Sequence, residues 1–283
     1  MKLTERHIIK PNNEIYKELV DITQKSNNLY NRGMFVIRQH YLRLSGHNFT
    51  EDISNSPKEF IDYYELNKLL KTTEDDNYRS LPANISQEVL KVLNQDWKSF
   101  FTLLRLKKNG KYSQSVKIPH YKKSGGKFVV TLNTVTLTSR TDTSVKIPKT
   151  KSWITGLRHL KQSTQIRIIP CGDHFVIEEI YEKETKSKRE DNGRYASIDL
   201  GVSNLASVSS NVTRPFIING RPLKSINQYY NKKKSTIQEE LMKVNKTRSS
   251  KKLRKLTLKR NNKIDWYLHN ASRYIVDYLV DNP

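Results

Sequence analysis

Apolar residues recur at helical spacing in three early stretches of the chain, residues 14–44, 60–70 and 85–104. This spacing predicts three amphipathic helices, because positions three and four apart share one face of a helix. The sequence Leu-Pro-Ala-Asn just before the third stretch is typical of a helix start. We expect Asn84 to be the N-cap of this helix, with Gln87 reaching back toward it.

The apolar period changes to two beyond residue 111, which predicts strands. Residues 2–10 show the same weak alternation and end at Pro11. Glycine and proline turns separate the later segments, as expected for antiparallel strands. The predicted strands after residue 111 are 127–132, 134–139, 143–147, 165–169 and 174–180. Together with the first strand they favour a small β-barrel into which the helical region is inserted.

A charged run without apolar residues, 183–193, is the clearest linker in the chain. Three short strands and two long helices are predicted after it, at residues 195–199, 205–209, 214–219, 226–244 and 253–279. We therefore expect an α+β protein of several domains. Their predicted ranges are 1–13 with 107–184 for the barrel, 14–106 for the helical insertion, 185–193 for the linker and 194–283 for a final α/β domain. Trp97, Phe100 and Phe101 are expected in the core of the helical insertion.

The composition limits the class of protein. Hydrophobic residues make up 35% of the 283 residues, which is enough to form cores. The apolar runs are far shorter than the roughly 18 residues of a membrane span, and the charged N-terminus is followed by no apolar segment. We therefore expect a cytoplasmic protein with no membrane partner. The single Cys171 excludes an internal disulfide and a cysteine-based zinc site, so no zinc site is expected in the chain.

The formal net charge of +23 is concentrated in two blocks. Residues 105–160 contain 13 basic residues and one acid, and residues 221–263 contain 15 basic residues and two acids, while residues 1–104 and 161–220 balance. Clustered basic blocks indicate a surface that binds a polyanion. Nucleic acid fits better than a membrane, because no face rich in Trp or Phe opposes the charges. Two solvated lysine-rich faces without a partner are the alternative.

The candidate nucleic-acid contacts are the basic and interleaved aromatic residues of these two blocks. A tyrosine between lysines can stack on an unpaired base, and packing inside the protein is the alternative for each tyrosine. Tyr229 and Tyr230 are further stacking candidates. The predicted contacts are Lys107, Lys108, Lys111, Tyr112, Lys117, His120, Tyr121, Lys122, Lys123 and Lys127 in the first block, and Lys232, Lys233, Lys234, Lys251, Lys252, Arg254, Lys255, Lys259 and Arg260 in the second.

The sharpest local signal is the segment 197–206, Ser-Ile-Asp-Leu-Gly-Val-Ser-Asn-Leu-Ala. An apolar strand ends in Asp199, Gly201 permits a tight turn, Asn204 can hydrogen-bond across it, and a second strand returns. Such a carboxylate is well placed to bind a divalent cation, although an Asp that only nucleates the turn is the alternative. Actin-like sugar kinases and ATPases place this pattern after a first strand, as do RNase H-like nucleases. Only 10 glycines and no duplicated domain argue against the first class.

Four motifs point to one family: Lys-Ile-Pro-His-Tyr-Lys-Lys at 117–123, the segment 197–206, Leu-Pro-Ala at 81–83 and the run 268–276. Together they resemble the TnpB (OrfB) family of insertion-sequence proteins, relatives of type V CRISPR effectors. The resemblance implies a small β-barrel with an inserted helical lobe, followed by an RNase H-like (RuvC-like) α/β domain. It also implies an RNA-guided DNA endonuclease that binds a guide RNA and double-stranded DNA and cuts with Mg²⁺. Asp199 corresponds to the first catalytic carboxylate and Mg²⁺ ligand.

The chain departs from this family toward its C-terminal end. The family's later catalytic carboxylates and its zinc ribbon of paired CxxC motifs are not present in the 283 residues, and two-metal cleavage needs several carboxylates. We therefore expect a truncated, incomplete RuvC-like domain with a weak Mg²⁺ site at Asp199 and no DNA cleavage by this chain alone. A missing C-terminal polypeptide is a candidate partner. A guide-independent DNA-binding or repressor module, a non-functional fragment of a transposase gene and, more remotely, an actin-like ATPase are the alternative interpretations.

Overall fold

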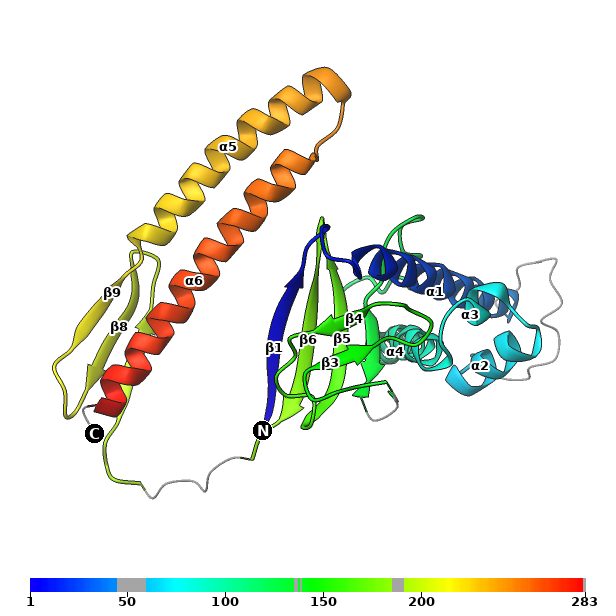
Figure 1. Cartoon of the computed structure of the whole chain (residues 1–283), viewed down its shortest axis with the longest axis horizontal. Coiled ribbons are helices and arrows are strands. Elements are labelled where there is room, and N and C mark those ends of the chain that lie inside the picture. The colour runs from blue at the N-terminus through cyan, green and yellow to red at the C-terminus, as the bar shows by residue number, and fades with distance from the viewer. Residues whose placement is uncertain (45–59, 135–136, 138, 185–190, 282–283) are drawn as a thin grey trace. The chain divides into compact units, whose positions relative to one another are not determined.

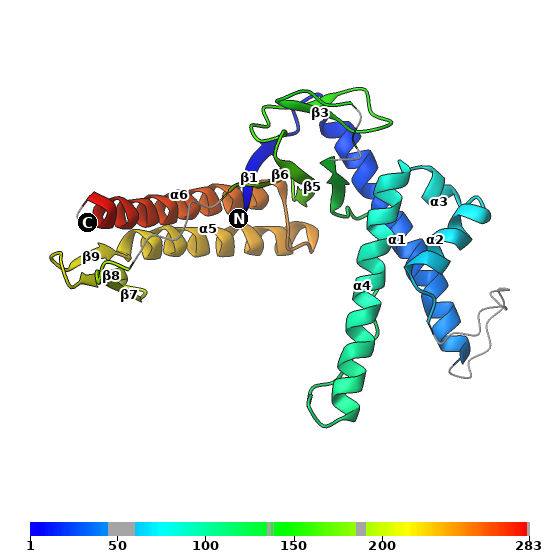
Figure 2. The same cartoon turned by 90° about the horizontal axis from the view of Figure 1, so that it is seen from below.

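A computed structural model places the chain in two compact units, unit 1 (Met1–Thr185) and unit 2 (Lys186–Pro283). The structure describes residues 1–44, 60–134, 137, 139–184 and 191–281. Each unit combines helices with antiparallel sheets (Figure 1; Figure 2), which confirms the expected mixture of α and β structure. Among the described helices, none has the combined length and apolar character of a membrane-spanning segment.

A four-stranded antiparallel sheet is the largest sheet of unit 1, with strand order β1-β6-β5-β2. Its strands are β1 (Lys2–Ile9), β2 (Val130–Asn133), β5 (Ser163–Cys171) and β6 (His174–Glu182). β5 and β6 form a hairpin whose turn contains Gly172 at a φ of 62°. β1 pairs with β6 along its whole length, from Lys2 opposite Glu182 to Ile9 opposite Phe175. The first strand of the unit therefore lies beside its last.

A separate two-stranded sheet consists of β3 (Ser144–Lys146) and β4 (Trp153–Thr155). The described strands do not pair into one closed barrel, so the barrel stays a prediction. The strand expected at 134–139 lies partly outside the described residues, and its described members are not in a strand. Thr134 instead accepts a turn hydrogen bond from the N–H of Leu137 (3.2 Å). The other predicted strands of this unit are confirmed with shifted ends, and β4 is an additional one.

The described part of unit 1 also contains four helices: α1 (Tyr16–Leu44), α2 (Tyr63–Thr72), α3 (Asp76–Arg79) and α4 (Ala83–Lys108). The three predicted helices are confirmed as α1, α2 and α4. The predicted N-cap of α4 is wrong, because Pro82 occupies that position and no side chain caps the helix. Pro82 already has a helical φ of −58°, so the helix begins directly after it. Asn84 therefore lies in the first turn, and the capping box with Gln87 is not formed.

An aromatic cluster forms the core of the helical part, as the apolar spacing predicted. Trp97 is fully buried, and its ring centroid lies 5.6 to 6.1 Å from those of Tyr41, Phe60, Phe100 and Phe101. These distances are typical of favourable aromatic contacts. The cluster therefore joins α1 to α4 through side chains from both helices.

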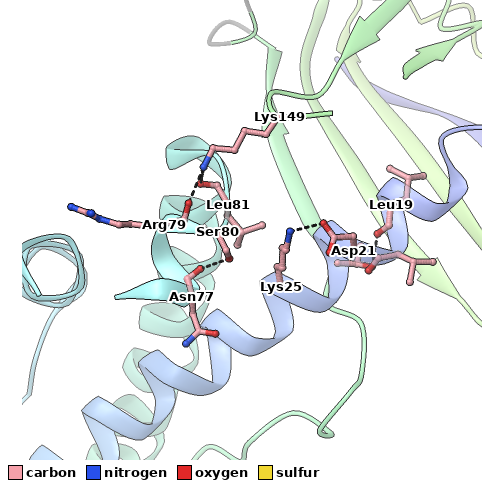
Figure 3. Close-up of polar contacts among 10 residues, drawn as sticks. Leu19, Asp21, Lys25, Asn77, Arg79, Ser80, Leu81 and Lys149 are labelled. Carbon is pink, nitrogen blue, oxygen red and sulfur yellow. Dashed lines mark hydrogen bonds and ion pairs between the residues drawn. The ribbon is translucent and has the colours of Figure 1, made fainter. Parts of the chain in front are cut away.

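A lysine links the small sheet to the helices (Figure 3). Lys149, in the connection between β3 and β4, donates hydrogen bonds to the backbone carbonyls of Arg79 (2.8 Å) and Leu81 (3.0 Å). Both carbonyls lie where α3 ends and α4 begins, and helix ends leave such groups without intrahelical partners. Lys149 itself has a left-handed φ of 65°, which is uncommon for lysine. The two hydrogen bonds help to hold it in this conformation.

A glutamate of α1 makes a second link between the same two parts. The Glu18 carboxylate accepts hydrogen bonds from the N–H of Lys151 (2.7 Å), the N–H of Ser152 (3.2 Å) and the hydroxyl of Ser152 (2.6 Å). Partial burial acts to raise the pKa of Glu18, but the hydrogen bonds from Ser152 and Lys151 outweigh it. The pKa of Glu18 is therefore lower than its ordinary value of 4.5.

Substituting Glu18→Gln is expected to lower the free energy of unfolding of unit 1 by about 2 kcal/mol near neutral pH, because hydrogen bonds to a charged group are lost. The lowered pKa means that the stabilisation is present above pH 4.5 and is lost as the pH falls through the folded-state pKa. Urea unfolding of both proteins over a falling pH series should show the two converging below pH 4.5. The exposed Glu14→Gln is the matched control, and an equal loss in it would contradict the assignment.

Unit 2 contains a three-stranded antiparallel sheet, β7-β8-β9, and two long helices. Its elements are β7 (Ala196–Leu200), β8 (Asn204–Ser210), β9 (Phe216–Asn219), α5 (Arg221–Asn245) and α6 (Lys251–Asp281). All five elements predicted for this region are confirmed. α6 packs on the sheet, since the Phe216 ring centroid lies 5.6 Å from that of Tyr274 and 4.6 Å from that of Tyr278. Ala206 and Val208 of β8 are buried.

Candidate functional site

The turn after Asp199 is closed by backbone contacts. The N–H of Gly201 donates to the carbonyl of Leu205 at 3.3 Å, so the chain reverses within a few residues. A Cβ on Gly201 would lie 2.7 Å from the carbonyl oxygen of Asn204, which leaves no space for a side chain. Glycine is therefore required at position 201, because the Asn204 carbonyl lies too close for any side chain. Asn204 contributes its backbone carbonyl to this contact, whereas the sequence suggested a role for its side chain.

The same turn is attached to the start of α5. The N–H of Gly220 donates to the carbonyl of Ser203 at 2.8 Å, and Lys224 of α5 donates to the Ser203 hydroxyl at 2.8 Å. Gly220 is buried, and a Cβ at this position would collide with the carbonyl oxygen of Val202. The loop that follows the aspartate strand is therefore fixed against the first turn of the helix.

Gly220→Ala is expected to destabilise unit 2 by about 1–3 kcal/mol, the usual cost of adding a group to a fully packed site. It should also increase the rate of amide hydrogen exchange at Gly201, Leu205 and Gly220, because these residues form the turn and its attachment to α5. Gly193→Ala is the matched control, because Gly193 has a φ of 69° but open space around a Cβ. This control changes backbone strain alone, and faster exchange at the turn in both variants would refute the role given to Gly220.

Asp199 lies on β7, an edge strand of its sheet, and its side chain is exposed. It stands opposite Ser207, while Ser197 stands opposite Ser209. These four side chains therefore share one face of the sheet. The hydroxyls of Ser197 and Ser209 are hydrogen-bonded at 2.8 Å. This face can present one carboxylate and several hydroxyl oxygens to a cation.

The described residues provide only part of a Mg²⁺ site at Asp199. Over the described ranges, one group of three potential metal ligands comes together, and it lies in unit 1 at Glu5, His7 and Glu179, not at Asp199. One carboxylate together with waters can hold Mg²⁺ weakly, but a two-metal site needs several carboxylates. The residues present therefore fit a single weakly held cation and do not fit a two-metal centre.

α5 and α6 form an antiparallel hairpin that carries the second basic block. Tyr230 and Thr257 share a hydrogen bond of 3.0 Å, and Arg260 donates to the side-chain oxygen of Asn227 at 2.9 and 2.7 Å. The Arg260 guanidinium also lies 5.6 Å from the centroid of the Tyr230 ring. Tyr230 and Arg260 therefore help to hold the two helices together, whereas Tyr229 is 60% exposed.

Most of the predicted contacts on this hairpin point into solvent. Two ion pairs of unit 2 are Lys243–Glu239 (2.9 Å) and Arg273–Asp277 (2.8 Å). None of the predicted lysines belongs to these pairs, so their charges are not compensated by a neighbouring carboxylate within the described part of the unit. Lys234 and Arg260 are half-buried. The exposed predicted contacts are Lys232, Lys233, Lys251, Lys252, Arg254, Lys255 and Lys259.

The first basic block includes an irregular segment, 117–123, that lies on α1. Asn31 bonds both the N–H (2.8 Å) and the carbonyl (3.0 Å) of Lys122, and Asn27 donates to the carbonyl of Lys123 (3.0 Å). These asparagines fix the backbone of the segment without neutralising its charge. This pairing could not be predicted from local patterns, because α1 and the segment are far apart along the chain.

Several residues of the first block have partners inside unit 1. Lys122 Nζ lies 4.6 Å from the Tyr30 ring centroid, and Lys127 Nζ lies 4.8 Å from that of Phe175. Burial lowers the pKa of Lys127. The ammonium groups of Lys122 and Lys127 therefore make cation–π contacts within unit 1.

Tyr121 is 44% exposed, with the guanidinium of Arg38 at 5.0 Å from its ring centroid. The half-buried Tyr112 donates a hydrogen bond to the side chain of Gln114 at 3.2 Å. The remaining predicted contacts of the block are exposed, namely Lys107, Lys108, Lys111, Lys117, His120 and Lys123.

The fold and site define a mixed α and β protein with a basic helical hairpin attached to a strand that bears an exposed aspartate. Residues 179–282 match the OrfB_IS605 family, described as a probable transposase. This match over the C-terminal part of the chain supports the resemblance to the TnpB/OrfB family that the motifs indicated. The matched segment includes the Asp199 turn and all of α5 and α6.

Comparisons with known proteins add the following similarities. The solved structure of a Cas12f1–sgRNA–target DNA complex is 13% identical to the chain with a TM-score of 0.48, covering 95% of this chain and 63% of that one. A CRISPR–Cas12f ternary complex is 11% identical with a TM-score of 0.28, covering 94% and 62%. The chain thus spans less than two thirds of the length of either protein. No curated protein matches the chain by sequence.

Proposed function

We propose that this chain is a nucleic-acid-binding protein of the RNA-guided nuclease lineage, which binds a guide RNA and a double-stranded DNA target. In this proposal unit 1 acts as a small barrel with an inserted helical lobe, and unit 2 as an RNase H-like (RuvC-like) domain. Base pairing with the guide selects the DNA sequence, while the protein contacts the backbone.

The observation that carries the proposal is the exposed basic surface of α5 and α6. The lysines predicted to contact nucleic acid there belong to neither of the ion pairs Lys243–Glu239 and Arg273–Asp277, and such uncompensated charge repels itself until a polyanion neutralises it. The start of the hairpin is hydrogen-bonded to the turn that follows Asp199, through Gly220 and Lys224. Nucleic acid bound along the hairpin therefore passes close to the aspartate.

We further propose that the 283 residues do not cut DNA on their own. The described residues bring one carboxylate, Asp199, to the edge of the unit 2 sheet, and phosphodiester cleavage by two metals needs several. In this proposal Asp199 and the hydroxyls beside it bind one Mg²⁺ weakly, and we assign no chemical step to it.

Copurification of RNA tests the guided-binding proposal. The chain should be expressed with its flanking genomic DNA, purified at moderate salt, and the bound RNA sequenced. We expect a discrete RNA that ends in a short variable segment. Random cellular RNA would contradict guide binding, and tight binding of duplex DNA in the absence of RNA would favour the guide-independent DNA-binding module.

A cleavage assay tests the second proposal. The purified complex should be incubated with Mg²⁺ and a duplex that matches the guide. We expect intact DNA with both the native chain and Asp199→Ala. A guide-dependent cut that requires Mg²⁺ and disappears in Asp199→Ala would overturn the proposal that the chain is inactive alone.

A further inference from the structure

Charged side chains lie among apolar ones on the core-facing side of the unit 1 sheet. On β6 the buried Phe175 and Ile177 share one face of the strand with Glu179, which is also 0% exposed. The register of β1 places Glu5 opposite Glu179 and His7 opposite Ile177. Alternation along the strands puts Glu5, His7 and Glu179 on the same face as the apolar residues. Three polar groups therefore stand where the pattern calls for apolar ones.

Two carboxylates directly opposite each other on neighbouring strands are unfavourable. Glu179 accepts hydrogen bonds from the backbone N–H groups of Arg158 and His159, each at 3.1 Å. These bonds orient the carboxylate but bring no full positive charge. Glu5, 20% exposed, lies 3.3 Å from Arg158 Nε and 3.1 Å from His159 Nε2. A fully buried carboxylate is costly unless a cation accompanies it.

The remaining member of the cluster has an unused donor atom. His7 Nε2 is buried and has no hydrogen-bond partner among the described residues, and it lies 3.5 Å from the nearer oxygen of Glu5. One ligand atom from each of Glu5, His7 and Glu179 lies within 4.8 Å of the other two. A cation between the three atoms can reach all of them after small movements of the side chains, because bonds from Zn²⁺ to His nitrogen and carboxylate oxygen are about 2.0–2.2 Å long.

We propose that Glu5, His7 and Glu179 bind a divalent transition-metal ion of the Zn²⁺ type. Imidazole together with carboxylates favours this class of metal, whereas Mg²⁺ and Ca²⁺ prefer oxygen ligands alone. His159, whose Nε2 is already beside Glu5, is available as a fourth donor. The backbone N–H groups on Glu179 act as the outer contacts that orient a metal ligand.

The bound ion fastens the N-terminal strand to β6 and to the loop that carries Arg158 and His159. Its role is structural, because the site lies on the core-facing side of the sheet and Glu179 is inaccessible to solvent. The inference is independent of the proposed function, which concerns nucleic acid and Asp199 of unit 2.

Metal binding to the full chain tests the proposal. The protein is stripped with a chelator, the chelator is removed, and Zn²⁺ binding is measured by equilibrium dialysis with metal analysis. Co²⁺ serves as a spectroscopic substitute, since its visible absorption reports the coordination geometry. We expect one Zn²⁺ per chain and a higher unfolding temperature with Zn²⁺ than without it. In His7→Ala and in Glu5→Gln we expect Zn²⁺ binding to be weaker by at least about 100-fold, because loss of an outer contact alone costs up to about that factor.

His174→Ala is the matched control, because His174 also lies on β6 but outside the cluster. Glu5→Gln keeps the size of a partly exposed side chain, so circular dichroism should show that this variant still folds. Loss of binding in the folded Glu5→Gln with retention in His174→Ala supports the site. No binding by the native chain, or equal binding by all variants, overturns it and means that Arg158 and the protonated histidines neutralise the cluster.

Discussion

Replacing Trp97 by alanine is expected to lower the free energy of unfolding of unit 1 by about 3–5 kcal/mol, the usual cost of removing a large buried aromatic side chain. Trp97 is fully buried and contacts the rings of Tyr41, Phe60, Phe100 and Phe101. These residues come from both sides of the helical core, so the cavity cannot collapse without moving α1 relative to α4. A whole domain is stable by only about 5–15 kcal/mol. Urea unfolding followed by circular dichroism measures the loss.

Two other variants make this prediction specific. Trp153→Ala removes the same side chain from the same unit, but Trp153 is 40% exposed, so we expect a loss of about 1 kcal/mol, a small fraction of that in Trp97→Ala. Trp97→Phe keeps an aromatic ring and removes a buried N–H that has no partner among the described residues, so it should also be much milder than alanine. Equal losses at Trp97 and Trp153 would mean that the aromatic cluster is not the core.

Neutralising four lysines of the hairpin is expected to weaken nucleic-acid binding about 1000-fold at low salt, because each phosphate contact contributes to the release of counterions. The variant is Lys232→Gln, Lys233→Gln, Lys255→Gln and Lys259→Gln, all at exposed positions. The slope of log affinity against log salt should become shallower by about 3. Fluorescence anisotropy with a labelled oligonucleotide over a salt series measures both quantities.

The matched control removes the same charge from the balanced N-terminal segment. Lys10, Lys17, Lys68 and Lys71 are exposed residues outside both basic blocks. Changing these four to Gln alters the net charge equally, so it separates a local binding surface from a general effect of charge. We expect a salt slope close to that of the native chain. If both sets reduce the slope alike, the hairpin is not the binding surface.

The periodic elements of the fold were predictable because each carries its own signal. α1 and α4 present long amphipathic patterns, and β5 and β6 alternate on either side of the Gly172 turn. β4 (Trp153–Thr155) was missed because its apolar residues Trp153 and Ile154 are adjacent and show no alternation, unlike Val145 and Ile147 at β3. The start of α4 was misplaced because Pro82 and Asn84 are both acceptable at a helix start, and only the backbone shows which one is the N-cap.

The site was predictable only in part. The position of Asp199 on an exposed strand followed from the local segment, whereas the attachment of its turn to α5 depends on Gly220 and Lys224, which no local pattern marks. The cluster of Glu5, His7 and Glu179 could not be found from the sequence either, because its members are joined only by the pairing of β1 with β6. No zinc site was expected because the chain has a single cysteine. Nucleic-acid contacts by the lysines stay a prediction.

The pairing of β1 with β6 has a consequence for synthesis. The amino group of Met1 donates a hydrogen bond to the carbonyl of Lys183 at 2.8 Å, just beyond β6. β1 can therefore pair with β6 only after the ribosome has passed the end of β6. At the usual rates of elongation this takes roughly 10 to 40 s. The helices α1 to α4 emerge in the interval and can pack on one another first. β1 therefore leaves the ribosome before the other strands of its sheet but can pair only after the last of them, β6.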